Sequence, residues 1–276
     1  MSDATGATPQ SNVALQSNAV RQSDAVLLVG HGTRDPAGTE EFFQLASVLA
    51  ERLAPLPVEG CLLEFQQPTI PEAWRTLVRR GAKQIRVAPL LLFAAGHARS
   101  DIPDAVAACA AETPGVCYSQ SGPLSRAPTI IALLSSRIRQ AADREAIQMD
   151  DSVALVMVGR GSYDPCAKAD MRVLGEIVAR RCAMPHHAVG FYAMAEPKLP
   201  GVLDEVADRS GIRTVIVQPH LLFQGRLYDA IAAQVAEASR RHPQVRFVVA
   251  DYLGPTAEVA EALVRRGFAE IPDSQT

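Results

Sequence analysis

The sequence has only five cysteines among 276 residues, and no two of them are spaced as CxxC. An odd number of cysteines without that spacing argues against a disulfide framework and against a cysteine-ligated zinc site. The formal net charge is −3, whereas proteins that neutralise phosphate backbones usually carry a basic excess. We therefore expect no nucleic-acid partner. The hydrophobic content of 48% predicts an ordinary globular protein with a sizeable core.

Long hydrophobic runs are also missing. No stretch approaches the roughly 20 apolar residues that a membrane-spanning helix requires, because the longest apolar runs are strand-sized and end at Gly or Pro. Residues 1–23 are rich in Ser, Gln, Asn and Ala and hold no apolar run long enough for a signal peptide. We expect residues 1–23 to be disordered, the protein to be cytoplasmic, and a membrane to play no part.

The chain contains an internal sequence repeat. The segment VLLVGHGTRDP at 26–36 returns as ALVMVGRGSYDP at 154–165, and later Pro, Leu-Phe and Gly-Pro matches follow at nearly the same offset. A match that keeps its register along most of a half is strong evidence for duplication. The sequence therefore predicts two homologous domains, 24–142 and 152–270, joined by a linker at 143–151.

Each half alternates short aliphatic runs with longer amphipathic stretches, which is typical of βα units around a buried parallel sheet. In the first half we expect strands at 25–29, 58–65, 84–92 and 116–119. Residues 37–54 carry their apolar side chains on one helical stripe. The pairs Asp35-Pro36 and Asp164-Pro165 have the form of an N-cap followed by Pro at the first helical position.

The predicted fold class is α/β, with two tandem homologous domains that each contain a four-stranded parallel sheet flanked by helices. We expect both domains to be doubly wound, with their strand ends facing each other across one cleft. A single chain of two copies can reproduce internally what a dimer of single units would form, so a monomer with two pseudo-symmetric halves is expected.

Three residues that can bind a metal follow successive expected strands. His31 follows the first, Glu64 ends the second and His97 comes just after the third. In open α/β sheets the ligand crevice lies at the carboxyl ends of the strands, so the three side chains should converge there. Two imidazoles and a carboxylate suit cobalt, iron or nickel, and they can also accept protons near neutral pH. A lone histidine in a loop is more often structural, but two histidines and a glutamate at parallel positions after successive strands favour a functional site.

The second half serves as an internal comparison. Its counterparts of His31, Glu64 and His97 are Arg160, Ala193 and Arg226. Arginine neither binds a cation nor acts as a base at working pH, but it pairs well with carboxylates. We therefore interpret the second half as a structural and substrate-holding partner, with solvated loop arginines as the alternative.

The other histidines are weaker candidates. The pair His186-His187 and His242 are expected at the surface. His220 follows Pro219 at the end of the third expected strand of the second half, so a contact with substrate is the serious alternative to a packed strand-end histidine.

Three segments carry a resemblance to a known family. VGHGTRDP at 29–36, EFQQPTIPE at 64–72 and APLLLFAAGHARSDIP at 88–103 resemble, in order and spacing, the His, Glu and His active-site motifs of the class II tetrapyrrole chelatases. Within that group they are similar to the sirohydrochlorin cobaltochelatase and ferrochelatase family, and GRGSYDP at 159–165 resembles its long, tandem form.

The resemblance implies ATP-independent insertion of cobalt or iron into sirohydrochlorin, a step toward cobalamin or siroheme. It implies no cofactor beyond the substrate metal ion, whether cobalt, iron or nickel, and a tetrapyrrole as the partner. Sirohydrochlorin is ringed by carboxylates, so arginines near strand ends are expected to hold it. These arginines are Arg34, Arg99, Arg160 and Arg226.

Two other functions use the same residues. A non-catalytic carrier of a metal or a tetrapyrrole is compatible with the fold and the side chains described above. A histidine-phosphatase interpretation of LVGHGTR requires an arginine immediately before the phosphorylated histidine, and Gly30 occupies that position. The second alternative therefore has little support.

Overall fold

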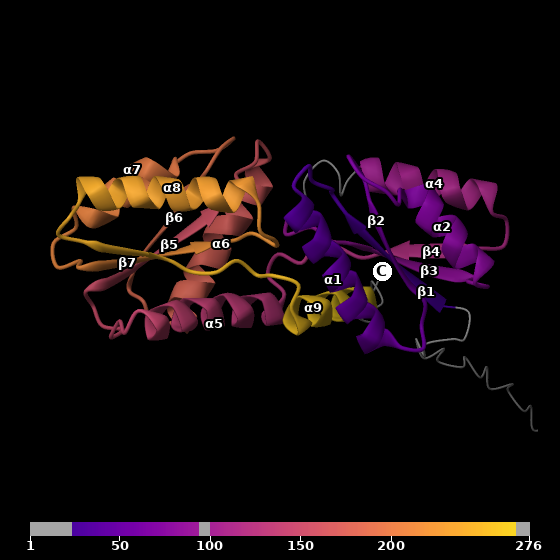
Figure 1. Cartoon of the computed structure of the whole chain (residues 1–276), viewed down its shortest axis with the longest axis horizontal. Helices are drawn as coiled ribbons and strands as arrows, with labels where there is room; N and C mark the ends of the chain where they lie inside the picture. Colours follow the sequence, from indigo (N-terminus) through magenta and orange to yellow (C-terminus); the bar gives the residue numbers. More distant parts are fainter. Residues whose placement is uncertain (1–23, 94–99, 269–276) are drawn as a thin grey trace, which may run out of the picture.

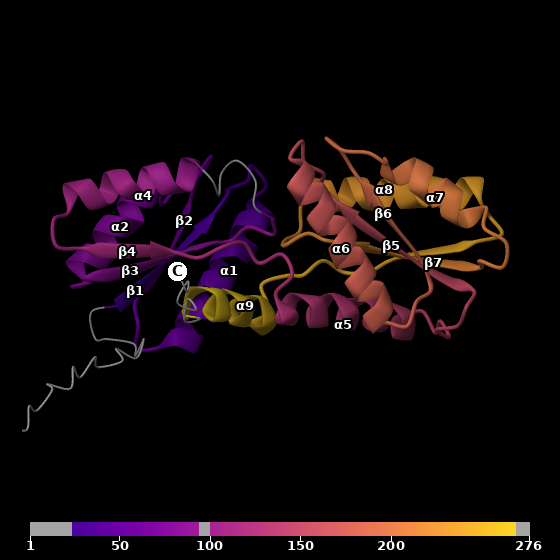
Figure 2. The same ribbon diagram turned by 180° about the vertical axis from the view of Figure 1, so that it is seen from behind.

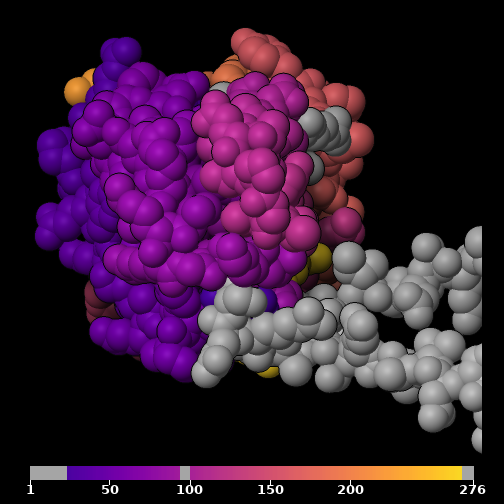
Figure 3. Space-filling model, turned by 90° about the vertical axis from the view of Figure 1, so that its right-hand side faces the viewer, coloured from indigo at the N-terminus to yellow at the C-terminus, as the bar shows by residue number. Residues whose placement is uncertain are grey.

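The computed structural model describes residues 24–93 and 100–268, and the expected disordered segment 1–23 lies outside this part of the chain. Two α/β units lie side by side along the long axis of the molecule (Figure 1). An end-on view shows the N-terminal unit in indigo to magenta, with the edges of the C-terminal unit behind it (Figure 3). The first sheet, here the N-terminal sheet, contains β1 (Asp24–Gly30), β2 (Val58–Leu62), β3 (Gln84–Pro89) and β4 (Cys117–Gln120). The C-terminal sheet contains β5 (Val153–Gly159), β6 (His186–Phe191), β7 (Thr214–Pro219) and β8 (Arg246–Val249).

Both sheets have four parallel strands with the same order, β2-β1-β3-β4 and β6-β5-β7-β8. Every residue of β1 and of β5 is buried, because helices cover both faces of each sheet. The expected α/β class with two doubly wound, four-stranded parallel sheets is confirmed.

The helices lie in two layers on each sheet. In the N-terminal repeat they are α1 (Pro36–Leu53), α2 (Ile70–Arg79), α4 (Asp101–Glu112) and α5 (Pro128–Arg144). In the C-terminal repeat they are α6 (Pro165–Arg181), α7 (Leu199–Ala207), α8 (Arg226–Arg241) and α9 (Ala257–Phe268). Separate apolar clusters join α2 and α4 to one sheet and α7 and α8 to the other. None of the helices in the described ranges is both long and apolar enough to cross a bilayer.

The last helix of each repeat covers the sheet of the other repeat. Helix α5 follows β4 in sequence but packs on β7 and α6, and α9 follows β8 but packs on α1 and β3. The view from behind shows α9 under the N-terminal sheet and α5 under the C-terminal sheet, placed end to end (Figure 2). The domain bounds 24–142 and 152–270 stay a prediction from the sequence, and in space the two packed units exchange their final helices.

This exchange produces one hydrophobic core that runs through both units. A single cluster of buried side chains includes Leu28 of β1, Leu155 of β5, Leu134 of α5 and Leu263 of α9. Separating the units would expose this surface, and each fully buried leucine contributes about 1.5–3 kcal/mol. The two sheets are consequently parts of one cooperative structure.

Arg86 of β3 anchors the C-terminal end of α9. One guanidinium nitrogen lies 3.1 Å from the buried carboxylate of Asp24, and the other donates to the carbonyl of Gly267 at 3.2 Å. The ring of Phe268 packs on the same guanidinium, 4.4 Å from its carbon to the ring centroid. The end of the described chain is thereby attached to the first sheet.

Glu41 of α1 attaches the N-terminal unit to two loops of the C-terminal unit. Its carboxylate accepts one hydrogen bond from the backbone N–H of Gln224 at 2.7 Å and another from the hydroxyl of Tyr252 at 2.6 Å. Burial, together with this carboxylate, raises the pKa of Tyr252 above its usual range. The phenol therefore stays protonated and continues to donate to Glu41 at neutral pH.

We expect Leu263→Ala to destabilise the protein by about 2–5 kcal/mol, because it empties a fully buried site in α9. Hydrogen exchange should accelerate in β1 and β3, which α9 covers. The matched control Arg266→Ala, on the exposed face of the same helix, should leave unfolding and exchange nearly unchanged. Accelerated exchange confined to β5–β8 would contradict the exchange of helices.

Candidate active site

A short loop between β1 and α1 holds His31 at the carboxyl edge of the N-terminal sheet. Asp35 ends the loop as the N-cap of α1, since its carboxylate accepts from the N–H of Ala37 at 3.1 Å. The hydroxyl of Thr33 accepts from the N–H of Asp35 at 3.0 Å, which closes the loop on the side of the cap. The expected cap and the helix start at Pro36 are confirmed.

The chain after β2 runs beside this loop and brings Glu64 next to His31. The N–H of Glu64 donates to the carbonyl of His31 at 3.0 Å. Gly32 makes this approach possible, because it has a φ of +92° and a Cβ there would lie 2.1 Å from the carbonyl oxygen of Glu64. The partly buried Glu64 is therefore fixed beside His31 through the backbone.

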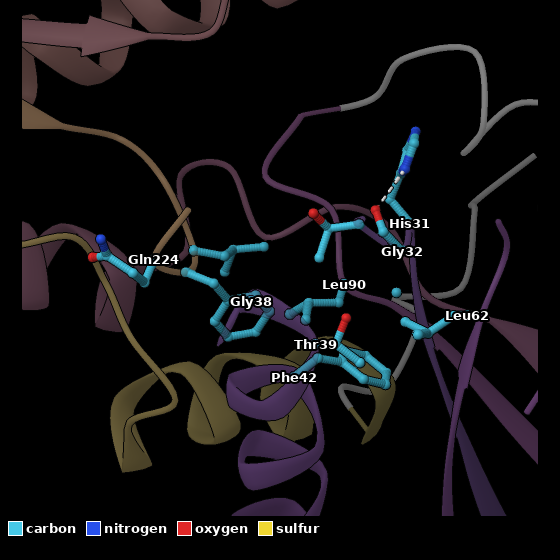
Figure 4. Close-up of a pocket in the computed structure, with 12 residues that line it drawn as sticks. His31, Gly32, Gly38, Thr39, Phe42, Leu62, Leu90 and Gln224 are labelled. Carbon is cyan, nitrogen blue, oxygen red and sulfur yellow. Dashed lines mark hydrogen bonds between the residues drawn. The ribbon is translucent and has the colours of Figure 1, made fainter. Parts of the chain in front are cut away.

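The imidazole of His31 is turned away from the apolar residues beneath it. A small cavity of about 160 Å³ lies under the loop, and the ring of His31 points away from Phe42, Leu62 and Leu90, which pack there (Figure 4). Its Nδ1 lies 3.2 Å from the carbonyl of Gly32, an oxygen that only accepts. A neutral ring that donates from Nδ1 carries its lone pair on Nε2, the atom suited to a proton or a metal ion.

The C-terminal repeat has the same backbone arrangement without the imidazole and the carboxylate. The N–H of Ala193 donates to the carbonyl of Arg160 at 2.9 Å, and a Cβ on Gly161 would lie 1.8 Å from the carbonyl oxygen of Ala193. These contacts match those of Glu64, His31 and Gly32, so the alignment drawn from sequence holds in space. An imidazole and a carboxylate are thus replaced by a guanidinium and a methyl group.

A cleft of about 670 Å³ lies between the two repeats at the carboxyl edges of both sheets. Both loops line it, with His31 on one side and Arg160 on the other, and Met171 and Leu227 belong to its apolar walls. The volume is within the range of small-molecule sites. The expectation that the strand ends face one cleft is confirmed.

Three of the four expected arginines line a second cavity that adjoins this cleft. Arg34, Arg160 and Arg226 surround a space of about 340 Å³, which shares Arg160 and Leu222 with the cleft. Within the described part of the chain, no carboxylate forms an ion pair with any of the three. Three guanidinium groups without an ion-pair partner favour the binding of an anion such as a carboxylate.

Two expected residues, His97 and Arg99, lie outside the residues that the structure describes. Within residues 24–93 and 100–268, no three His, Cys, Asp or Glu side chains are grouped to hold a metal ion. Of the expected set of three, the structure places the backbones of His31 and Glu64 side by side, while Glu64 is not among the residues that line the cleft.

The remaining histidines divide into two kinds. His187 and His242 are partly buried and do not lie fully at the surface as expected, and their Nε2 atoms lie 2.8 Å from a carboxylate oxygen of Glu176 and 2.9 Å from one of Asp204. His220 instead is buried and lines the cleft.

Two exposed aromatic residues beside the site were not expected from the sequence. Tyr163 is 81% exposed and lines the cleft at the position that Arg34 occupies in the other repeat. Phe65 is 54% exposed, and its ring lies 6.5 Å from that of His31 and 4.9 Å from the guanidinium carbon of Arg34. The signal available in the sequence was an aromatic residue in an otherwise polar loop, Phe65 beside Gln66 and Gln67, and Tyr163 between Ser162 and Asp164.

Curated relatives share most of the chain. A sirohydrochlorin ferrochelatase of Priestia megaterium is 32% identical over 231 residues, covering 84% of each chain. A sirohydrochlorin cobaltochelatase of the same organism is 28% identical over 233 residues, covering 83% of this chain and 74% of the other.

Solved structures and a family model agree with these relatives. SirB from Bacillus subtilis with Fe³⁺ has a TM-score of 0.79 at 27% identity, with 88% of this chain and 94% of that one covered. SirB from Bacillus subtilis subspecies spizizenii, in complex with cobalt, has a TM-score of 0.75 at 28% identity, with 92% and 98% covered. The CbiX family model matches twice, over residues 25–141 and 154–269. The resemblance drawn from the motifs is confirmed, and the chain belongs to the CbiX family in a tandem form with two copies of its unit.

Proposed function

We propose that this protein inserts a divalent metal ion, cobalt or iron, into sirohydrochlorin without ATP. The observation that carries the proposal is the cleft between the repeats, with His31 on one wall and three unpaired arginines in the adjoining cavity. The relatives named as sirohydrochlorin cobaltochelatase and ferrochelatase support it. The product would enter the synthesis of cobalamin or siroheme.

The reaction asks for two changes at the macrocycle. Two pyrrole N–H protons must leave, and the hydrated metal must lose water as ring nitrogens replace it. An imidazole side chain can accept a proton or bind a borderline divalent ion. We assign these tasks to His31 and His97, with Glu64 assisting from its position beside His31.

The arginines supply the affinity for the substrate. Carboxylates on the rim of the tetrapyrrole match the planar donors of Arg34, Arg160 and Arg226, and we assign Arg99 to the same role. Arg160 and Arg226 belong to the C-terminal repeat, so that repeat holds substrate while the other performs the chemistry. A monomer in the cytoplasm, with no resident cofactor, completes the proposal.

Incubation of sirohydrochlorin with cobalt, iron and nickel in parallel should give metallated product with a protein concentration well below that of the substrate. The absorption spectrum of the tetrapyrrole reports the product. Many turnovers per protein chain are expected with cobalt or iron. A plateau at one equivalent would identify a carrier instead of an enzyme.

We expect His31→Ala to reduce turnover by about 10²–10⁴-fold, since a positioned acid–base group contributes about that much. Folding should be intact, because the side chain lies outside the core. Unfolding curves check the fold, and saturating substrate separates kcat from KM. His187→Ala, at a site outside the cleft where the imidazole lies 2.8 Å from Glu176, is the matched control and should turn over sirohydrochlorin as the unmodified protein does.

Arg160→Ala or Arg226→Ala should raise KM for sirohydrochlorin several-fold while leaving kcat nearly unchanged, because each exposed charge pair contributes about 1 kcal/mol or less. Added salt should reduce the difference from the unmodified protein. Arg266→Ala, which removes an exposed arginine from α9, is the control. If the arginine variants lost turnover at saturating substrate while His31→Ala kept it, the catalytic centre would belong to the C-terminal repeat.

A further inference from the structure

His220 is a buried histidine without a hydrogen-bond partner. It lies directly after β7, is 2% exposed, and neither Nδ1 nor Nε2 finds a partner among the described residues. Burial lowers its pKa to about 3, so the ring is neutral at physiological pH. Leaving both ring nitrogens unpaired in the interior lowers the stability of the fold.

The other repeat shows that the fold does not need this imidazole. The N–H of His220 donates to the carbonyl of Val158 at 2.7 Å, and the N–H of Leu90 donates to the carbonyl of Val29 at 2.8 Å. The two residues therefore occupy the same place after the third strand of their sheets. Leu90 is 3% exposed and fills that place with a purely apolar side chain. Packing alone gives no reason for a histidine there.

His220 faces the cleft between the repeats. It lines the same space as His31 and Arg160. Its ring contacts the ring of Phe93 from the N-terminal repeat, with 5.1 Å between centroids and 58° between planes. For the imidazole to reach a bound molecule the ring of Phe93 has to change rotamer, and changes of rotamer on binding are common.

We propose that His220 is a substrate-binding residue whose neutral imidazole forms hydrogen bonds with the tetrapyrrole held in the cleft. A neutral imidazole offers one N–H donor and one acceptor nitrogen. A free-base tetrapyrrole offers the complementary groups, pyrrole N–H donors at its centre and carboxylate acceptors at its rim. The inference rests on the proposed function and adds to it a contact from the repeat that lacks the metal-binding residues.

The tetrapyrrole fits His220 better than a metal ion does. Neutral imidazole also binds metals, but a stable site needs several ligands. Across the described ranges, His220 has no group of His, Cys, Asp or Glu side chains with which it could hold a cation. The apolar walls of the cleft around it suit a flat organic molecule.

The test replaces His220 with the residue that the other repeat carries. His220→Leu should unfold at the same or a higher temperature than the unmodified protein, because it removes unpaired buried polar atoms. Fluorescence titration with sirohydrochlorin, without metal, should show affinity weaker by about 3- to 10-fold, the effect of one or two hydrogen bonds. Titration with cobalt alone should be unchanged. A residue that served packing only would not combine unchanged stability with weaker binding.

His220→Gln supplies the matched variant, since an amide restores one donor and one acceptor. It should recover part of the lost affinity, and it carries the test if His220→Leu does not fold. Unchanged affinity for sirohydrochlorin in both variants would overturn the inference, and so would a loss of cobalt binding in His220→Leu. The unmodified protein tests the proposed function separately. If it bound sirohydrochlorin but inserted no metal, the proposed chelatase activity would be refuted, whereas the proposed contact of His220 with the tetrapyrrole would not.

Discussion

Helices α5 and α9 each leave the sheet that precedes them in sequence and cover the other sheet, and this exchange determines how the two repeats sit together. The resulting core contains Leu28 of one sheet and Leu155 of the other, so the units cannot drift apart without exposing apolar surface. Glu41 adds a polar attachment between the same units. The cleft is therefore formed before any ligand arrives, and arginines of both repeats already surround one cavity. A preformed site avoids the entropy that ordering it during binding would require.

Much of the fold could be predicted because its signals are local. Asp35 and Asp164 cap helices through atoms two residues away, and the repeat locates equivalent strands without knowledge of their partners. The exchange of helices could not be predicted, because the two sheets are homologous and offer similar apolar faces. The buried stripe of α9, which includes Leu263, would suit either sheet. The path of the loop before α9 and the contacts of Arg86 with the end of that helix distinguish the two sheets, and neither can be predicted from hydrophobic periodicity.

The candidate site also combines features that the sequence predicts with features that only the three-dimensional packing reveals. His31 and Glu64 meet because each follows a neighbouring strand, a relation that the order of strands already contains. The unpaired state of Arg226 depends on every carboxylate around it, and the unpaired nitrogens of His220 depend on burial from all sides. Those properties belong to three-dimensional packing and leave no trace in spacing. His97 has its place in the motif but lies outside the described residues, so its role is still a prediction from sequence.

The position of α9 also bears on how the protein is made. Ribosomes synthesise the chain from its N-terminus, and domains ordinarily fold as they emerge. Here one face of the N-terminal sheet is completed by α9 (Ala257–Phe268), which is translated after every other helix in the described part of the chain. Until then, one face of β1, including Val26, has only part of its cover. Before α9 emerges, the chain carries the His31 loop on a partly covered sheet, so completion of the N-terminal unit depends on the synthesis of α9.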